Sequence, residues 1–515
     1  MIFGEVKIMI YPNLWRALVI VLCMLLSSTG LHAETTLRIA SPLVAPDSDN
    51  PYRALSLPSS VSSQVMYDPL VVIGRDGKVA PWLLTAWDSE GSKVWRLTLR
   101  QGVTFSNGVP LTADAIVGSV MDMQTPKGRA WTVGSSLANI DRAEALSGGT
   151  VSIILKRPDP MFPWRMAIWR LPEPESWKTR KGDPSQPPAA NTGPFSMVER
   201  GEARLVYDAN PYAWNKPAAD HLELIHLPDQ TARLQAMNAD AIDIALQMGT
   251  GDRELIESIG GQMLERRTTR VMYMTFTKEH VPESNPVHDV RVRLALNYGV
   301  NRQRISELLL DGRGKMQGQL VLPGAPGYVE ELKSFPYDPE KAKALLMEAG
   351  YEDGLALSIR FAPAGADDMV VYQQAAQDLR QIGVTLNLLN AAVGEMTRMM
   401  FAGDFRADMF GNFGRGLDPL GDFRYRSCIG QTGKYPPYFC DEVSLGFIRK
   451  AQQATSIEEV DALMQQVTRQ EYNNPPGIFL WPGIMVDALN TSVVSADGYG
   501  DYYDYIPYHA IKIAD

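Results

Sequence analysis

Few side chains of this 515-residue chain have the types and spacing that catalysis or metal binding needs. His221 and His226 share a short predicted strand, but five residues apart they would face opposite sides of it. A metal site would therefore need distant partners. The neighbouring carboxylates Asp367 and Asp368 fit a helix N-terminus better than acid–base machinery, because the helix dipole favours negative charge there. The sequence also lacks a nucleophile elbow, a phosphate-binding loop and an HExxH motif, which argues against an enzyme.

The N-terminal residues have the features of a secretory signal peptide. Lys7 and Arg16 come before an apolar run at residues 17–26, which is too short to span a bilayer stably. Residues 31–33, Leu-His-Ala, suit a signal peptidase. We expect a soluble mature chain that begins at Glu34 in the periplasm, since no later apolar run reaches 18 residues. The alternative is an N-terminal membrane anchor.

Two of the three cysteines lie beyond this segment. Cys428 and Cys440 are twelve residues apart in a stretch rich in glycine and proline, whereas Cys23 would leave with the signal peptide. Export makes a disulfide the expected state, and closing so short a loop would contribute roughly 3 kcal/mol. A metal pair or a redox pair is the alternative, but the CxxC spacing and a neighbouring histidine are missing.

The composition is that of a large globular protein with two or three domains, with 45% apolar and 21% charged residues. Its 49 basic and 59 acidic residues give a net charge of −10, which argues against a nucleic-acid partner. Ten tryptophans and twenty tyrosines favour a wet binding cleft lined with aromatic rings. Trp131 is our candidate for such a ring, and the alternative is that it belongs to a core.

The stretch from Tyr67 to Val117 is predicted to form a module of short strands and turns. Asp-Gly tolerates the positive φ of a hairpin turn, and alternating apolar and polar residues suit a half-buried strand. The predicted elements are a turn at Asp76-Gly77, a strand at residues 94–100, a helix that begins at Ala113 with Thr112 as its cap, and a hairpin over residues 141–157 that turns at Gly148-Gly149.

The order and spacing of these residues resemble the signature of the family 5 extracellular solute-binding proteins, the peptide, opine and nickel receptors of ABC importers. More than a dozen positions match in register, and Asn107 departs from the usual Asp. The matches are Tyr67, Pro69, Leu70, Asp76, Gly77, Pro81, Leu83, Trp87, Trp95, Arg100, Gly102, Phe105, Gly108 and residues 110–114.

Later segments carry the resemblance along most of the chain. They are residues 191–195, 210–214, 234–245, 289–296 and 337–351. In the last of these the local physics agrees with the family pattern, because Asp338 can cap a helix, Pro339 suits its first position and Gly350 can end it.

The resemblance implies an α/β fold, a two-lobed periplasmic binding protein of the type II, cluster C-like class, with an extra subdomain inserted in the first lobe. Two strands should cross between the lobes, one of them near residues 271–277, and the lobes should close over a solute by a hinge motion. The implied segments are a signal peptide at 1–33, lobe I at 34–57, 186–270 and 486–515, the inserted subdomain at 58–185, and lobe II at 271–485.

The loop around Asp418 corresponds to the family loop that contacts the charged end of the ligand in the peptide receptors. Arg415 stands where those receptors hold the carboxylate that pairs with the α-ammonium of a peptide. An arginine there would bind a carboxylate or phosphate and repel an ammonium. It could instead point into solvent or pair with Asp418 or Asp422. Asn412 replaces the aromatic residue of this loop, which Phe413 could supply after a one-residue shift.

The function implied by the resemblance is the solute-binding component of an ABC importer. Such a protein would act as a monomer without a cofactor, capture a small molecule or short peptide, and deliver it to an inner-membrane permease. The alternatives are a secreted hydrolase of peptides or esters and a redox or folding factor that uses Cys428 and Cys440. Short peptides, opines, other anionic amino-acid derivatives and metal chelates are all compatible with the sequence.

Overall fold

The computed structural model describes residues 34–44, 49–53, 57–180, 183, 185–309, 312, 318–362, 368–421 and 437–514. Residues 36–514 form one compact unit, and of the second unit, Met1–Thr35 with Asp515, only Glu34 and Thr35 are described. The predicted signal peptide and Cys428 therefore lie outside the described residues. Among the described helices, none is both long enough and apolar enough to cross a membrane.

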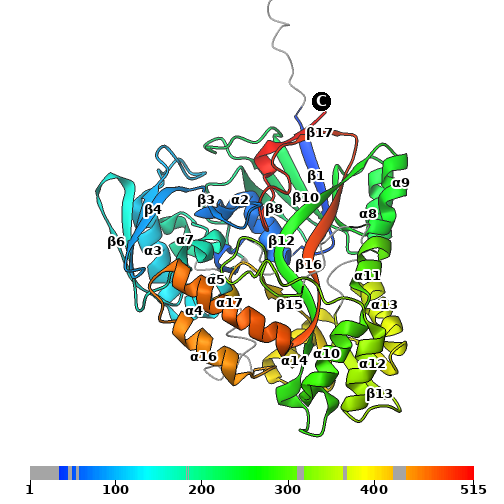
Figure 1. Cartoon of the computed structure of the whole chain (residues 1–515). Helices are drawn as coiled ribbons and strands as arrows, with labels where there is room; N and C mark the ends of the chain where they lie inside the picture. The colour runs from blue at the N-terminus through cyan, green and yellow to red at the C-terminus, as the bar shows by residue number, and fades with distance from the viewer. Residues whose placement is uncertain are drawn as a thin grey trace, which may run out of the picture. The chain divides into compact units, whose positions relative to one another are not determined.

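A mixed ten-stranded sheet runs through this unit, and its two longest strands lie next to each other near its middle (Figure 1). These are β12 (Gln262–Phe276) and β16 (Gly477–Leu489), which pair antiparallel. The full order is β14 (Val384–Asn390), β13 (Leu355–Phe361), β15 (Met409–Arg415), β12, β16, β11 (Ile244–Met248), β1 (Thr36–Ser41), β10 (His221–His226), β9 (Arg204–Ala209) and β8 (Phe195–Arg200).

We call the side of this sheet from β11 to β8 lobe I and the side from β15 to β14 lobe II. Strand β12 pairs with β15 of lobe II, and β16 pairs with β11 of lobe I, so the two long strands join the lobes. The predicted crossing at residues 271–277 is the second half of β12, which begins nine residues earlier than that stretch, at Gln262. Strand β1 lies in lobe I between β10 and β11, and it pairs parallel with both.

Lobe II contains a strand–helix–strand unit. Helix α13 (Asp368–Arg380) connects the parallel strands β13 and β14, and it begins at Asp368, as expected for a helix N-terminus. In α12 (Pro339–Glu348), the Asp338 side chain accepts a hydrogen bond from the Lys341 amide at 2.9 Å, so the predicted cap is confirmed. The other helices on this side are α10 (Val290–Gly299), α11 (Arg302–Leu309), α14 (Val393–Ala402), α16 (Glu442–Ala451) and α17 (Ile457–Asn473).

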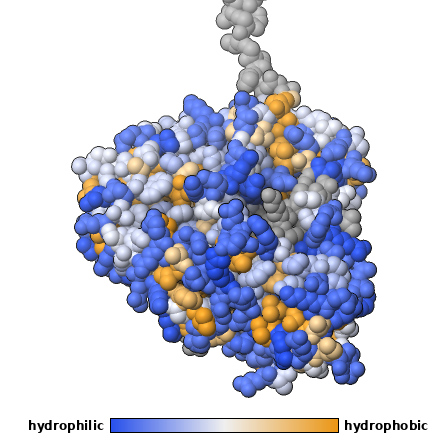
Figure 2. Space-filling model, viewed as in Figure 1, coloured by the Kyte–Doolittle hydropathy of each residue, from blue (hydrophilic) through white to orange (hydrophobic). Residues whose placement is uncertain are grey.

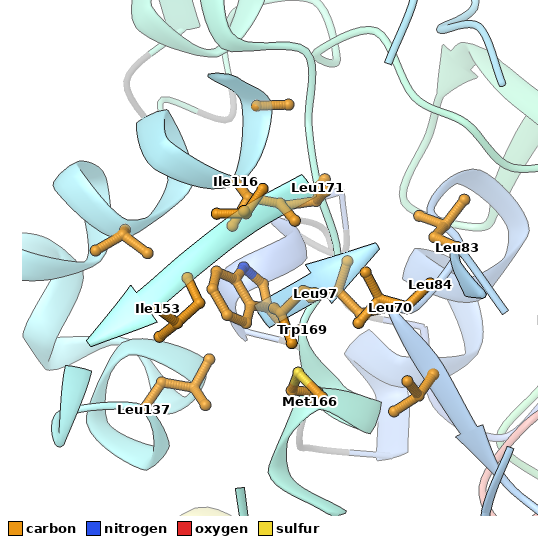
Figure 3. Close-up of a cluster of buried hydrophobic side chains, with 14 of the residues drawn as sticks. Leu70, Leu83, Leu84, Leu97, Ile116, Leu137, Ile153, Met166, Trp169 and Leu171 are labelled. Carbon is orange, nitrogen blue, oxygen red and sulfur yellow. The ribbon is translucent and has the colours of Figure 1, made fainter. Parts of the chain in front are cut away.

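A second sheet forms the subdomain attached to lobe I. Its antiparallel strands are β4 (Leu84–Glu90), β5 (Val94–Leu99), β7 (Thr150–Leu155) and β6 (Ile140–Ala145), in that order. The predicted turn at Gly148-Gly149 joins β6 to β7, and both glycines have positive φ. Buried side chains from this sheet and from α3 (Ala113–Gln124) surround Trp169, as Figure 3 shows. Thr112 precedes α3 as predicted, but its side chain makes no capping hydrogen bond.

The remaining elements connect these layers. They are α2 (Leu57–Met66), β2 (Val71–Ile73), β3 (Val79–Pro81), α4 (Pro126–Ala130), α5 (Thr132–Ser136), α6 (Phe162–Arg165), α7 (Pro174–Arg180), α8 (Gln230–Asn238), α9 (Arg253–Ser258), β17 (Val493–Ala496) and β18 (Ile511–Ile513). Asp76-Gly77 turns between β2 and β3, as predicted, with Gly77 at φ 77°. The face in Figure 2 is mostly hydrophilic, and its apolar side chains gather in several small groups.

Candidate functional site

The subdomain and lobe II contact each other through two tight turns. A Cβ added at Gly77 would lie 2.6 Å from the Pro323 carbonyl oxygen, and one added at Gly324 would lie 1.8 Å from the Asp76 carbonyl oxygen. Only glycine fits at either position. Behind this contact, Ile73 of β2 packs in one buried apolar cluster with Leu322, Leu417, Tyr273 and Phe479. The candidate site is the region next to these contacts, where β12, β15 and the subdomain meet.

A buried ion-pair network crosses from the subdomain to lobe II. The Arg165 guanidinium donates to both oxygens of Asp418, at 3.1 Å and 3.4 Å, and it also pairs with Asp159. The side chains of Arg165, Asp159 and Asp418 are 10%, 6% and 23% exposed. Burial opposes the charge of Arg165, but Asp159 and Asp418 outweigh it and raise the pKa of this guanidinium. Asp418, predicted as a ligand contact, thus joins the lobes in this structure.

The predicted ligand residues Asn412, Phe413 and Arg415 lie on β15. Their segment was predicted as a loop, and this was wrong, since Arg415 is the last residue of a strand and pairs with Arg270 of β12. Asn412 donates hydrogen bonds to the Tyr273 hydroxyl at 3.0 Å and to the Thr275 hydroxyl at 3.3 Å. The side chains of Phe413 and Arg415 are outside the described part of the structure, so their roles stay predictions.

Trp131 occupies a core position in the subdomain. It is 7% exposed, stacks on Tyr52 at 5.6 Å and meets Trp177 edge-on at 5.7 Å. The hydroxyl of Tyr52 in turn bonds to Ser119 of α3 at 3.0 Å. The structure therefore favours the alternative in which this ring packs in the core.

Sequence reasoning missed a buried arginine where the subdomain joins lobe I. Arg170 is 4% exposed, its Nε has no hydrogen-bond partner, and its one described hydrogen bond, to the Ile168 carbonyl, is long at 3.5 Å. Burial lowers its pKa to about 10, against the opposing effect of Tyr505, Asp68 and Asp504 nearby. No sequence motif could have singled out this arginine. What distinguishes it is that none of the described ion pairs includes it, and this depends on the tertiary structure.

Asp68 is a buried carboxylate close to Arg170. It directly precedes Pro69, which forms an isolated β-bridge with Arg170. The indole nitrogens of Trp82 and Trp214 donate to its two oxygens at 2.8 Å and 2.9 Å. Burial raises the pKa of Asp68 to about 6, although both indoles and Arg170 favour the charged form.

The buried charged side chains described above could bind a ligand, but their arrangement suggests no chemical reaction. The described residues contain no group of three or more His, Cys, Asp or Glu side chains that could hold a metal ion. Of the two histidines on β10, His221 lies 2.8 Å from Asp208 of the neighbouring strand.

Comparison with known proteins decides the family. The family model described as "Bacterial extracellular solute-binding proteins, family 5 Middle" matches residues 78–430. The chain belongs to this family. Among curated relatives of this solute-binding family, the chain is 26% identical over 500 residues to di/tripeptide-binding protein 2 of Pseudomonas aeruginosa, covering 91% of this chain and 93% of the relative.

A second relative is the nickel-binding periplasmic protein of Escherichia coli, 30% identical over 399 residues, covering 72% of this chain and 74% of the relative. Among solved structures, the binding protein AgaA from A. tumefaciens R10 in complex with agropinic acid superposes with a TM-score of 0.74 at 20% identity, covering 93% of this chain and 99% of that chain. This superposition shows that the chain has the two-lobed α/β fold of the family 5 solute-binding proteins. The named relatives are solute-binding proteins, so the alternative of a secreted hydrolase is not supported.

Proposed function

We propose that this family 5 protein captures a small anionic solute of peptide or opine type between its lobes and delivers it to the permease of an ABC importer. It would do so as a periplasmic monomer after loss of residues 1–33. The proposed segments are those of the family: lobe I at 34–57, 186–270 and 486–515, the subdomain at 58–185 and lobe II at 271–485. Di- and tripeptides and agropinic acid, which are named for two of the similar proteins, carry carboxylates, whereas a third similar protein is named for nickel.

The observation that carries the anionic solute is Arg170. A buried guanidinium without a carboxylate partner is costly, because desolvation favours the neutral form and unmade hydrogen bonds add to the cost. Asp68 and Asp504 act on Arg170 only from a distance, and no described ion pair includes it, so a carboxylate of the solute would supply a direct counterion and a bidentate acceptor. Arginine suits this role better than lysine, since its planar fork matches the two oxygens.

Arg415 supports the same conclusion from the sequence. It replaces the carboxylate that the peptide receptors of the family use for the α-ammonium, so the charge of this position is reversed. Its backbone lies at the end of β15, next to Arg270, where the strand enters the segment that contains Asp418. We propose that Arg415 binds an anionic group of the solute, and that Asn412 and Phe413 shape the same region.

Native mass spectrometry of the purified protein would identify a co-purified solute by its mass. Calorimetry would then compare wild type, Arg170→Gln and a control, Arg406→Gln, with di- and tripeptides and with agropinic acid. Arg406 is a suitable control because its side chain is 73% exposed and pairs only with Asp404 among the described ion pairs. We expect Arg170→Gln to weaken binding about 10- to 100-fold, as the loss of a charge-assisted bond does, and Arg406→Gln to leave it unchanged. A bound solute without an anionic group, or equal affinities for all three proteins, would refute the proposal.

A further inference from the structure

Thr269 lies at a break in the pairing of the two long strands. The register of β12 against β16 shifts between Arg267 and Val271, so the backbone between these residues turns to other partners. The Thr269 amide and hydroxyl both donate to Asp504 Oδ2, at 3.1 Å and 2.5 Å. The Thr269 carbonyl accepts from the Gly416 amide at 2.7 Å. One residue therefore connects two segments that are far apart in the sequence.

The first of these segments is the C-terminal stretch, which belongs to lobe I. Asp504 has a positive φ of 53°, a conformation that non-glycine residues adopt rarely. Aspartate in such a turn commonly bonds to its own backbone. Here the carboxylate instead reaches a residue 235 positions away, and the Asp504 amide donates to the Arg267 carbonyl at 3.0 Å. The Gln64 side chain of α2 holds the Asp504 carbonyl at 2.6 Å.

The second segment, residues 416–421, follows β15 directly and consists of a turn and three helical residues. Gly416 accepts a hydrogen bond from the Leu322 amide at 2.9 Å, and a Cβ at this position would lie 2.5 Å from Leu322 Cγ. Only glycine fits there. Its amide donates to Thr269 and its carbonyl accepts from Leu322, so hydrogen bonds fix its backbone at both ends. The segment then presents Asp418, whose carboxylate meets Arg165 of the subdomain.

We propose that Asp504 is a positioning residue for solute capture: through Thr269, it fixes the segment at residues 416–421 and the end of β15 in place. The inference rests on the proposed function, in which Arg415 and this segment border the solute. Both bonds from Thr269 to Asp504 must break before Thr269 can move away from lobe I. The Gly416 amide loses its acceptor when that happens, so the solute-facing end of β15 gains freedom.

Three variants separate the carboxylate from the backbone conformation. Asp504→Gly keeps the positive φ at no steric cost but removes the acceptor. Asp504→Asn keeps one neutral acceptor for the Thr269 amide, and it is the variant to use if the glycine variant does not fold. Asp501→Ala is the control, since Asp501 lies on the same stretch and pairs with Arg75 at an exposed site.

The first readout is hydrogen exchange at the Gly416 amide in the solute-free protein. We expect exchange to be at least tenfold faster in Asp504→Gly, about threefold faster in Asp504→Asn and unchanged in Asp501→Ala. The second readout is the dissociation rate of trialanine and of agropinic acid, measured by stopped-flow tryptophan fluorescence. We expect a rise of about tenfold in Asp504→Gly for whichever of the two binds wild type.

The outcomes separate this inference from the proposed function. Unchanged Gly416 exchange in both Asp504 variants would overturn the inference, and so would faster exchange with an unchanged dissociation rate. If wild type binds neither probe nor any peptide of the calorimetric panel, the proposed function fails, while Gly416 exchange still shows whether Asp504 holds the segment.

Discussion

Removing Arg165 should destabilise the protein more than the loss of an ordinary ion pair would. In Arg165→Met, Asp159 and Asp418 lose the guanidinium that both of them contact, and the side chain of Asp159 is only 6% exposed. Breaking a buried pair from one side costs about 3–5 kcal/mol, because a charge is left without compensation. Asp418→Asn should cost less, about 1–2 kcal/mol, because Arg165 retains Asp159 as its counterion.

The loss in Arg165→Met should depend on pH. Burial already raises the pKa of Asp159 in wild type, even though Arg165 opposes that rise. Without Arg165 the pKa rises further above the unfolded value of about 3.9. A carboxyl group with a raised folded pKa contributes stability below its unfolded pKa and loses it as pH rises through the folded pKa. The deficit of Arg165→Met should therefore be largest at pH 7 and shrink toward pH 4.

Urea unfolding at pH 7 and at pH 4.5 would measure this, with Arg142→Met as the control. Arg142 pairs with Asp141 and Glu144 at an exposed site, where solvent screens the charges, so its loss should leave the free energy of unfolding nearly unchanged. Small-angle scattering of the solute-free proteins would show whether the lobes separate once the pair is broken. A deficit below 1 kcal/mol in Arg165→Met, or one that does not change with pH, would show that this network does not hold the lobes together.

Three further predictions concern groups elsewhere in the chain. Asp68, with a pKa raised to about 6 by burial, should contribute stability that is complete below pH 4 and falls by about 3 kcal/mol as pH rises to 6; chemical unfolding should show this slope in wild type but not in Asp68→Asn. Cys428 and Cys440 should form a disulfide worth roughly 3 kcal/mol, and non-reducing peptide mapping that finds two thiols in freshly exported protein would contradict it. Arg415→Ala should weaken solute binding about 10- to 100-fold, with Arg415→Lys recovering part of the loss, whereas unchanged affinity would identify Arg415 as a solvated charge.

Elements with strong local signals could be predicted from the sequence. The Asp76-Gly77 turn and the Asp338 cap depend on neighbouring residues only, and both are present as expected. Strand β15 was missed because Gly411 and Gly414 interrupt its alternation. At Gly411 the glycine is required, since a Cβ would lie 2.4 Å from the Tyr372 hydroxyl oxygen. A close approach of this kind is set by packing and leaves no local signal.

The site could be predicted only where the family pattern pointed to it. The family motif singled out Asp418 as a ligand contact, which stays a prediction. Its partner Arg165 is 253 residues away, and nothing in the sequence connects the two. Arg170 looks like any other arginine until the fold shows that no carboxylate reaches it among the described ion pairs. For Trp131 the sequence left a cleft and a core position open, because an amphipathic ring suits both, and the structure shows the ring buried in the subdomain.

The contact between Gly77 and Gly324 has a consequence for transport. The backbone of one turn contacts the backbone of the other, and the two glycines have no side chain that could change conformation to alter their separation. Such a contact acts as a mechanical stop, which sets how far the lobes can approach whatever lies between them. Cargoes of different size that all permit the stop to be reached would leave the outer surface in one and the same shape. A permease could then recognise that the receptor is loaded without reading what it carries.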